Sequence, residues 1–307
     1  MDQKSKWVFI INPVAGNGYA LGLEGKIREM IARHDLQAEM VFTERRGHAT
    51  ELSQYYADSG FRYIIAVGGD GTMNEVAYPL IYRKDVVLGL VGAGTGNDFL
   101  QITGFQGRFE ERDWDAFLRL KTTPMDIGKC NDKIFLNGMG LGFDAQVAAE
   151  NYTEPGEVKP GGKSKYIWHI LKTLLFFKEK KMVVITNGQT IITDCFMNTI
   201  ANGRRFAGGF YLTPEALAND GLLDVCAIKE VSLPQRLKIL LMVPKGTHIN
   251  DKRVHYYKTE KLSLEFPSEV PFHVDGELFF AKDFEVTTLP GALNIIYNPE
   301  GSHYFSN

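Results

Sequence analysis

The sequence predicts a two-domain protein whose first half is α/β and whose second half is mostly β. Strands alternate with helices over about the first 120 residues, and glycine-containing loops follow several of these strands. From about residue 125 onward, strand-like runs joined by turn residues dominate. Alternating strands and helices are typical of βαβ units with a parallel sheet and right-handed crossovers. A chain of 307 residues is long enough for two domains.

Composition is that of a globular protein, with 44% hydrophobic and 23% charged residues. The net charge of -3 provides no overall attraction to nucleic acid, so we expect no nucleic-acid partner. Three cysteines far apart in the sequence, Cys130, Cys195 and Cys226, indicate a reduced, cytoplasmic compartment. Because no uncharged apolar run reaches membrane-spanning length, we expect no transmembrane helix.

The first half shows four strands and three helices in alternation. Residues 63–68 are apolar without alternating polar positions, which is typical of a buried parallel strand. Pro13 ends the first strand because it has no amide to give to a sheet. We predict strands over 7–12, 38–43, 63–68 and 86–91, and helices over 20–33, 47–58 and 72–81.

A glycine turn, Gly68–Thr72, follows the third strand. Thr72 and Glu75 have the spacing of a capping box, so the next helix is expected to begin there. Backbone amides and the positive end of the helix dipole would suit a phosphate group. An ordinary capped βα turn explains this stretch equally well.

The fourth strand runs into a second glycine turn, Gly92–Asp98, where Thr95 and Asp98 repeat the spacing. In parallel sheets ligands bind beyond the carboxyl ends of the strands, where Asn12, Pro13 and Thr43 also lie. We therefore expect a ligand site at this edge. Neither turn matches a P-loop or a dinucleotide-binding fingerprint, which disfavours both of those classes.

The second half is predicted to be mostly antiparallel. Residues 183–193 form a hairpin around the turn Asn187–Gly188, and residues 125–149 are also interpreted as strands. Further strands are expected over 222–228, 261–266, 272–274, 284–288 and 292–297. A helix over 234–243 begins after Ser232 and ends at Pro244.

A further helix over 166–177 is apolar and aromatic, with lysines on both sides. This pattern fits an interfacial membrane helix. It also fits an amphipathic helix packed on the β domain with lysines reaching solvent, and we favour this second interpretation.

Two polar clusters complete the set. One runs from Asn202–Gly209 through Pro214 to Asn219–Asp224, and the other is His273–Glu277. Asp-Gly pairs are common in hairpin turns, so each cluster alone has an ordinary structural explanation.

Together these motifs resemble the diacylglycerol kinase catalytic family, specifically its soluble bacterial lipid kinases. The resemblance rests on an ordered set of motifs and runs from about residue 6 to about residue 297: Asn12–Pro13 with Gly16, Gly68–Thr72, Gly94–Asp98, Asn219–Asp224 and Val274–Glu277. The Gly-Gly-Asp-Gly-Thr signature alone also occurs in phosphofructokinases and NAD kinases. The full ordered set is more specific.

The resemblance implies a doubly wound nucleotide-binding domain over 1–124, like that of phosphofructokinase and NAD kinase. A β-sandwich-like lipid-substrate domain would follow over 125–297, with the active site in the cleft between the two domains. Whether the tail 298–307 packs back on the first domain is left open.

The resemblance also implies ATP and Mg²⁺ as cofactors and assigns residues to them. Asp70, Asp98 and Asp126 would belong to a magnesium and water network, and Asp220 would hold a structural Mg²⁺ with the carbonyls of Leu217 and Leu222. Oxygen ligands of this kind are those that Mg²⁺ prefers. The nucleotide-binding set would be Asn12, Pro13, Gly16, Thr43, Gly68, Gly69, Asp70, Gly71, Thr72, Met73, Asn74, Gly94, Thr95, Gly96 and Asn97.

Glu277 corresponds to the family's proton acceptor, with Asp70 and Asp275 as the other catalytic candidates. Spacing alone does not separate Glu277 from Asp275. No lysine or arginine lies within 14–18, so the cation that neutralises the transferring phosphate is unassigned, with Arg204 or Arg205 as a guess. Two other departures from the family pattern are Gly92, where proline is usual, and Val14–Ala15 before Gly16.

The expected reaction is Mg²⁺-dependent transfer of the γ-phosphate of ATP to a lipid hydroxyl, of diacylglycerol or a related lipid in phospholipid synthesis. The lipid would be met at a membrane surface through peripheral contact, and a homodimer is left open. A kinase of a soluble metabolite such as NAD is the first alternative. A non-enzymatic regulator that binds DNA is the second, disfavoured by the acidic balance and the lack of a recognisable reading helix.

Overall fold

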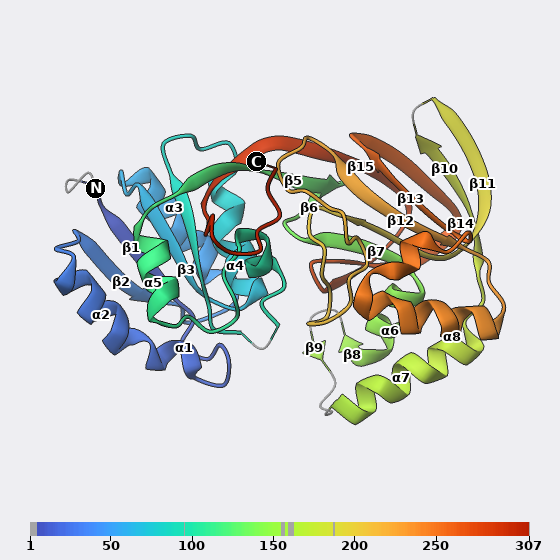
Figure 1. The fold of residues 1–307 in the computed structure, drawn as a ribbon, viewed down its shortest axis with the longest axis horizontal. Helices are drawn as coiled ribbons and strands as arrows, with labels where there is room; N and C mark the ends of the chain where they lie inside the picture. Colours follow the sequence, from blue (N-terminus) through green and yellow to red (C-terminus); the bar gives the residue numbers. More distant parts are fainter. Residues whose placement is uncertain (1–4, 95, 155–156, 159–162, 187, 307) are drawn as a thin grey trace. The chain divides into compact units, whose positions relative to one another are not determined.

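The computed structural model describes residues 5–94, 96–154, 157–158, 163–186 and 188–306. The chain divides into two compact units (Figure 1). Unit 1 contains Met1–Ile127, Ala218–Asp220 and Pro290–Asn307, and unit 2 contains Gly128–Leu217 and Gly221–Leu289. The first unit is therefore built from three separate stretches of the sequence.

Unit 1 contains the predicted parallel sheet, in the order β2-β1-β3-β4. All residues of its central strands β1 and β3 are buried, as their uninterrupted apolar sequences predict. The last part of β15 also runs parallel to β4, with Ile295 opposite Leu88. The strands are β1 (Trp7–Ile11), β2 (Ala38–Phe42), β3 (Tyr63–Gly68) and β4 (Val87–Gly92).

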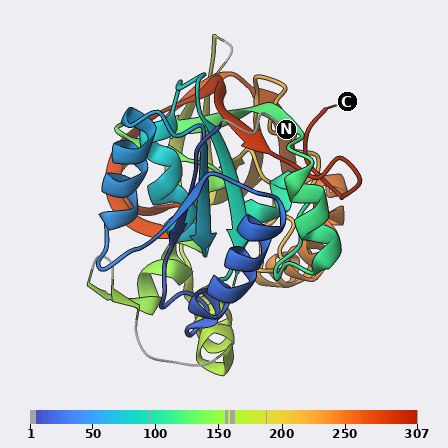
Figure 2. The same ribbon diagram turned by 90° about the vertical axis from the view of Figure 1, so that its left-hand side faces the viewer.

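Helices cover both faces of this sheet, with α3 and α4 on one face and α2 and α5 on the other (Figure 2). A salt bridge of 2.5 Å between Lys26 and Glu111 joins α2 to α5. The doubly wound arrangement is thereby confirmed. The helices are α1 (Tyr19–Gly22), α2 (Glu24–Arg33), α3 (His48–Asp58), α4 (Asp70–Ala77) and α5 (Glu111–Leu118), with 3-10 turns η1 (Tyr78–Leu80) and η2 (Phe99–Thr103).

Two details of the prediction for unit 1 are wrong. The helix expected over 20–33 is interrupted at Leu23, where α1 ends and α2 begins. The capping box does not form, because α4 already begins at Asp70 after Gly69. The Glu75 carboxylate instead accepts a hydrogen bond of 3.0 Å from the Gly47 amide, at the start of α3.

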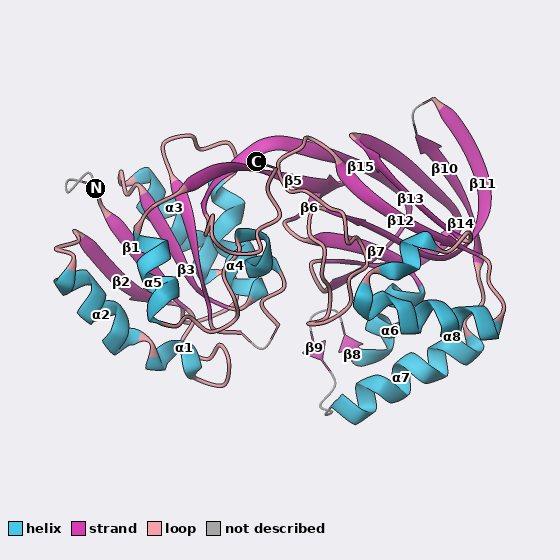
Figure 3. Ribbon diagram, viewed as in Figure 1, coloured by secondary structure: helices cyan, strands magenta, loops and turns pink. Residues whose placement is uncertain are grey.

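Unit 2 is mostly antiparallel, as predicted, with strands in the order β13-β12-β11-β10-β14-β15 and β7 paired with both β11 and β14 (Figure 3). Its strands, with a short β8–β9 pair, are β5 (Thr122–Cys130), β6 (Lys133–Phe135), β7 (Gly138–Gly142), β8 (Tyr152–Glu154), β9 (Glu157–Val158), β10 (Lys180–Thr186), β11 (Gln189–Ala201), β12 (Leu223–Lys229), β13 (Val254–Thr259), β14 (Lys261–Val274) and β15 (Glu277–Ile296). β5 and β15 each contain residues of both units.

The predicted hairpin is confirmed, since Thr186 of β10 pairs with Gln189 of β11. Gly188 in its turn has φ 74, the left-handed conformation that glycine adopts readily. Asn187 lies outside the described residues. Strand β13 was not predicted, and the short strands expected over 261–274 join into the single strand β14.

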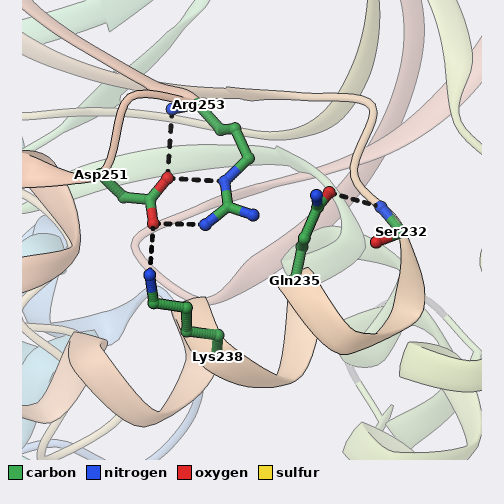
Figure 4. Close-up of polar contacts among 5 residues, drawn as sticks. All are labelled: Ser232, Gln235, Lys238, Asp251 and Arg253. Atoms are coloured by element: carbon green, nitrogen blue, oxygen red, sulfur yellow. Dashed lines mark hydrogen bonds and ion pairs between the residues drawn. The ribbon is translucent and has the colours of Figure 1, made fainter.

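The helices of unit 2, as far as the structure describes it, are α6 (Phe143–Asn151), α7 (Lys163–Phe176) and α8 (Leu233–Met242), with 3-10 turns η3 (Val243–Lys245) and η4 (Thr247–Asn250). The predicted α7 and α8 are confirmed, and α8 starts at Ser232 through a capping box with Gln235 (Figure 4). The strand interpretation is wrong for 143–149, which form α6. Gly142, with φ 91, ends β7, and Asp144 then lies in the first turn of this helix.

The described residues of unit 2 include two apolar cores. One lies among the strands and includes Phe272 and Phe284. The other includes Leu174 of α7 and Ile239 of α8, so it joins these helices to the sheet. In the described part of the chain, every helix is too short or too polar to span a bilayer.

Candidate functional site

The carboxyl ends of the four parallel strands of unit 1 lie side by side. The Thr43 amide, after β2, donates to Ile11 O at 2.9 Å, and the Asn12 amide, after β1, donates to Val67 O at 3.0 Å. Beyond β3 and β4, the Ala93 amide donates to Gly68 O at 2.7 Å. The residues that the sequence placed at strand ends therefore form one continuous edge, as parallel pairing requires.

Three loops touch at this edge, and glycine makes the contact possible. A Cβ at Gly16 would lie 2.0 Å from Ala93 O, and Gly16 has φ +59. A Cβ at Gly94 would lie 2.5 Å from the Gly69 Cα. Backbone approach this close excludes side chains at these positions. The backbones of the loops after β1, β3 and β4 therefore lie in direct contact at this edge.

Asp70 connects the first turn of α4 to the second glycine loop. Its carboxylate oxygens accept hydrogen bonds from the amides of Asp98 at 3.2 Å and Phe99 at 3.0 Å. Burial raises the pKa of this carboxyl above its ordinary value, and hydrogen bonds from the amides of Phe99, Asp98 and Asn97 offset that effect only in part. Asp70 thus holds a loop in place as well as carrying a carboxylate.

Two asparagines fix the loops from within. Asn12 donates from Nδ2 to the Thr72 hydroxyl at 3.0 Å, which ties the β1 loop to α4. Asn97, with φ 56, accepts from the Gly94 amide at 2.9 Å and donates to the Gly94 carbonyl at 3.0 Å. Thr95 lies outside the described residues.

Asp126 lies in β5 and is buried. Its amide donates to Ala218 O at 2.7 Å, and its carboxylate accepts from the Gly291 amide at 2.7 Å. Asp126 therefore joins the three sequence stretches that make up unit 1. Asp98, the third member of the expected magnesium network, immediately precedes η2.

In unit 2, Asp275 and Glu277 lie at the turn between β14 and β15, where Val274 pairs with Glu277. The Asp275 carboxylate accepts three backbone amides of one segment, Leu136–Gly138, at 2.7, 3.0 and 2.9 Å. Glu277 is exposed. The Asp275 carboxylate thus clamps the turn to the sheet.

The residues expected to hold a structural Mg²⁺ lie in the segment around Gly221, which has φ 77. Asp220, Leu217 and Leu222 are each half-buried. One carboxylate and two carbonyls are an oxygen-only donor set, which fits the preference of Mg²⁺. Within the described ranges, no group of three or more His, Cys, Asp and Glu side chains could hold a metal.

Arg108 is a candidate that the sequence analysis missed. Its guanidinium lies 4.2 Å from the centre of the Tyr19 ring, directly after the β1 loop. A Cβ at Gly92 would lie 2.3 Å from the carbonyl of Gly107, so the segment of Arg108 also borders the β4 loop. A single arginine outside any motif gives no sequence signal.

The two arginines suggested from the sequence both belong to unit 2 and bond to nearby carbonyls. Arg204 donates to Ala216 O at 2.8 Å, and Arg205 donates to Gly208 O.

The chain belongs to the lipid kinases that carry a diacylglycerol kinase catalytic domain, as two family models and a relative of 31% identity show. Residues 6–130 match the model of the diacylglycerol kinase catalytic domain. Residues 138–297 match the YegS C-terminal NAD kinase beta sandwich-like domain.

Individual relatives agree. A protein of Cronobacter sakazakii named "Probable lipid kinase YegS-like" is 31% identical over 272 residues, covering 85% of this chain and 87% of the relative. A diacylglycerol kinase of Bacillus subtilis is 27% identical and covers 87% of this chain and 88% of the relative. A crystal structure of a diacylglycerol kinase from Bacillus anthracis has a TM-score of 0.73 at 20% identity, over 97% of this chain and 98% of that one. At that identity the structural likeness shows the fold alone.

Proposed function

We propose that this protein transfers the γ-phosphate of ATP to the hydroxyl of a lipid, with Mg²⁺ as cofactor. The observation that carries the proposal is the meeting of three loops at the edge of the parallel sheet, with Gly16, Gly69 and Gly94 in backbone contact distance. Membership of the lipid kinase family supports the same reaction. Phosphoryl transfer needs positioning and charge neutralisation. The backbone amides of these loops would serve the positioning, and the neutralising cation would come from outside them.

The nucleotide phosphates would lie against the loops Gly68–Asn74 and Gly94–Asn97, with Thr43 beside the nucleotide. The amino end of α4 follows Gly69, so its dipole favours an anion there. We assign Arg108 as the cation beside the phosphates, because its segment borders two of the three loops. An arginine is suited to phosphate through its planar set of donors.

Mg²⁺ would be held through water by Asp70, Asp98 and Asp126. Its chemical contribution would be to neutralise the charge of the transferring phosphate. The structure supports this set in part, because Asp70 bonds directly to the amide of Asp98. A second, structural Mg²⁺ would take Asp220 with the carbonyls of Leu217 and Leu222, as that oxygen donor set allows.

Glu277 would accept the proton of the lipid hydroxyl. It is exposed, whereas the Asp275 carboxylate is occupied by three backbone amides. Because the Asp275 carboxylate is committed to the backbone, we assign Asp275 to positioning its turn. We keep Glu277 as the general base because it corresponds to the family's proton acceptor. The acceptor class rests on the family: the Bacillus subtilis relative is named a diacylglycerol kinase. The lipid would be met at the cytoplasmic face of a membrane.

Paired substitutions test the two carboxylates. Glu277→Gln is expected to leave ATP binding and the melting temperature nearly unchanged while turnover falls about 10²–10⁴-fold. Asp275→Asn is expected to lower the free energy of unfolding by about 1–3 kcal/mol, because Asn keeps one acceptor oxygen and sets an NH2 group against a buried backbone amide. ATP binding by calorimetry, melting curves and turnover are measured on both variants. Full turnover in Glu277→Gln would refute the general-base role.

A kinase of a soluble metabolite such as NAD remains the second candidate. The observation in its favour is that residues 138–297 match a domain described as NAD kinase beta sandwich-like.

A further inference from the structure

Helices α7 and α8 are apolar on two sides. Their inner sides are buried in one core, through Leu174 of α7 and Ile239 of α8. A helix that is apolar all round is normally buried all round. Here the outer sides are exposed instead. Among the side chains that the structure describes, the exposed large apolar residues of the two helices are Trp168, Leu171, Leu175, Phe176, Leu233, Leu237 and Leu241. We call this set the α7–α8 face.

The spacing of these residues shows that the face is organised. Trp168, Leu171 and Leu175 follow the i, i+3, i+7 pattern of one helix side, and Leu233, Leu237 and Leu241 follow i, i+4, i+8. Exposure reaches 74% for Phe176 and 72% for Leu241. Single exposed apolar residues are common on protein surfaces, but two adjoining stripes indicate a binding surface.

The two helices are fixed to each other, so the face is a rigid surface. Arg236 of α8 donates to Leu174 O of α7 at 2.8 Å and to the Glu179 carboxylate at 2.6 Å. α8 is held in turn by its capping box and by Lys238, which bonds to Asp251 at 3.3 Å (Figure 4). A preformed surface loses little conformational entropy on binding.

The charged side chains of α7 and α8 themselves are all basic. Neither helix contains Asp or Glu, although the whole chain has a net charge of -3. Lys172 and Lys238 are half or more exposed, and exposed lysines continue beyond α7 at Lys178, Lys180 and Lys181. Three carboxylates lie close by, at Glu150 against Lys172, at Glu179 against Arg236 and at Asp251 against Lys238.

We propose that the α7–α8 face docks on the surface of a bilayer containing anionic lipids, with Trp168, Phe176 and Leu241 entering the interface. Apolar and aromatic residues flanked by lysines are the composition that binds in this way. A second copy of the chain fits less well, because a two-fold contact would oppose two faces of the same positive charge. This inference rests on the proposed function, because docking on a bilayer would bring the protein to a lipid substrate that lies in it.

Docking is measured on the whole protein without ATP, by sedimentation with vesicles of phosphatidylglycerol and phosphatidylcholine or of phosphatidylcholine alone. Tryptophan fluorescence gives a second readout, because Trp7 and Trp114 are buried and Trp168 is 63% exposed. Binding to the anionic vesicles with a blue shift of the emission is expected. No blue shift and no sedimentation with anionic vesicles would overturn the proposal.

Two variants locate the contact. Phe176→Gln combined with Leu241→Gln is expected to weaken vesicle binding by about tenfold or more, because apolar area no longer enters the interface. The matched control is Ile192→Gln, which changes a residue 71% exposed on β11. The β10–β11 hairpin lies at the opposite end of unit 2 from α7 in both views, so this control should bind normally (Figures 1 and 2). Equal binding by the control and the double variant would contradict the assignment.

Two further outcomes separate this inference from its alternatives and from the proposed function. Sedimentation without lipid that shows a dimer lost in the double variant would assign the face to a second copy and overturn the proposal. Transfer to a soluble short-chain diacylglycerol is measured in parallel. If that transfer is full while vesicle binding is absent, docking fails and the proposed function stands. If vesicle binding is as expected while no lipid is phosphorylated, the docking surface stands and the proposed function fails.

Discussion

At the scale of single residues, carboxylates in this protein act both on the backbone and in the proposed chemistry. Asp70 accepts amides of the β4 loop, and Asp275 accepts three amides of Leu136–Gly138. Glu277, two residues after Asp275, is exposed. The sequence spacing does not show which of these two carboxylates holds the backbone of the turn, whereas the hydrogen bonds do.

Arg108 gives the sharpest prediction at this scale. Arg108→Gln is expected to lower turnover with ATP by about 10–100-fold, because one cationic donor beside the phosphates is lost. Steady-state kinetics with varied ATP measure the effect. Arg62→Gln is the matched control, since Arg62 also lies over a tyrosine, Tyr63, but at the amino end of β3. Equal activity of the two variants would remove Arg108 from the site.

Among loops and helices, the β1 loop offers a comparison of two glycines with left-handed φ. Gly18→Ala is expected to cost about 1–2 kcal/mol from backbone strain alone, because nothing lies within 4 Å of a Cβ there. Gly16→Ala should cost about 1–3 kcal/mol more from overpacking and should also weaken ATP binding, because its Cβ would meet Ala93 O. Denaturant unfolding and ATP titration measure both. Equal losses would show that the loops can separate.

The network that holds α8 predicts a pH dependence of stability. The pKa of Asp251 is held below its ordinary value, chiefly by hydrogen bonds from Arg253. A carboxyl with a lower pKa in the folded state stabilises the protein above the unfolded-state pKa, about 3.9, and loses this contribution as pH falls further. Asp251→Asn should therefore lower the melting temperature at pH 7, and its difference from the wild type should shrink below about pH 4.

Melting curves across pH measure this difference. Asp283→Asn is the control, because Asp283 pairs with Lys282 only at the exposed surface. A difference for Asp251→Asn that stays constant from pH 7 to below about pH 4 would contradict the linkage.

At the scale of helices and strands, the sequence predicted the elements that local residue patterns determine. The parallel strands, the hairpin at residues 187–188 and the start of α8 at Ser232 all follow from apolar runs or turn residues. The capping box at Thr72 failed because its side chains found partners elsewhere: Thr72 binds Asn12, 60 residues away, and Glu75 binds Gly47. Contacts between residues so far apart in the sequence cannot be predicted from local residue spacing.

For the whole molecule, unit 1 is discontinuous in sequence. Residues 218–220 and 290–307 belong to it, and the Ala218 amide donates to Tyr304 O at 2.8 Å. The composition break near residue 125 reflects the change from alternating strands and helices to antiparallel strands. The composition gives no sign that residues 290–307 belong to unit 1, because the chain passes from one unit to the other within β15, a single strand of 20 residues.

Only part of the candidate site could be predicted from the sequence. Its strand-end residues were predictable, because parallel strands place their carboxyl ends together. Arg108 was not predictable, because only the fold brings its segment beside Gly92 and Tyr19.

The central claim is that the phosphate goes from ATP to a lipid hydroxyl. The most direct test incubates the protein with ATP labelled at the γ-phosphate and separates the products from a panel of diacylglycerol, phosphatidylglycerol, ceramide, sphingosine and NAD. We predict a labelled lipid that forms with Mg²⁺, disappears on chelation and is reduced about 10²–10⁴-fold in Glu277→Gln. Labelled product from NAD alone would contradict the account.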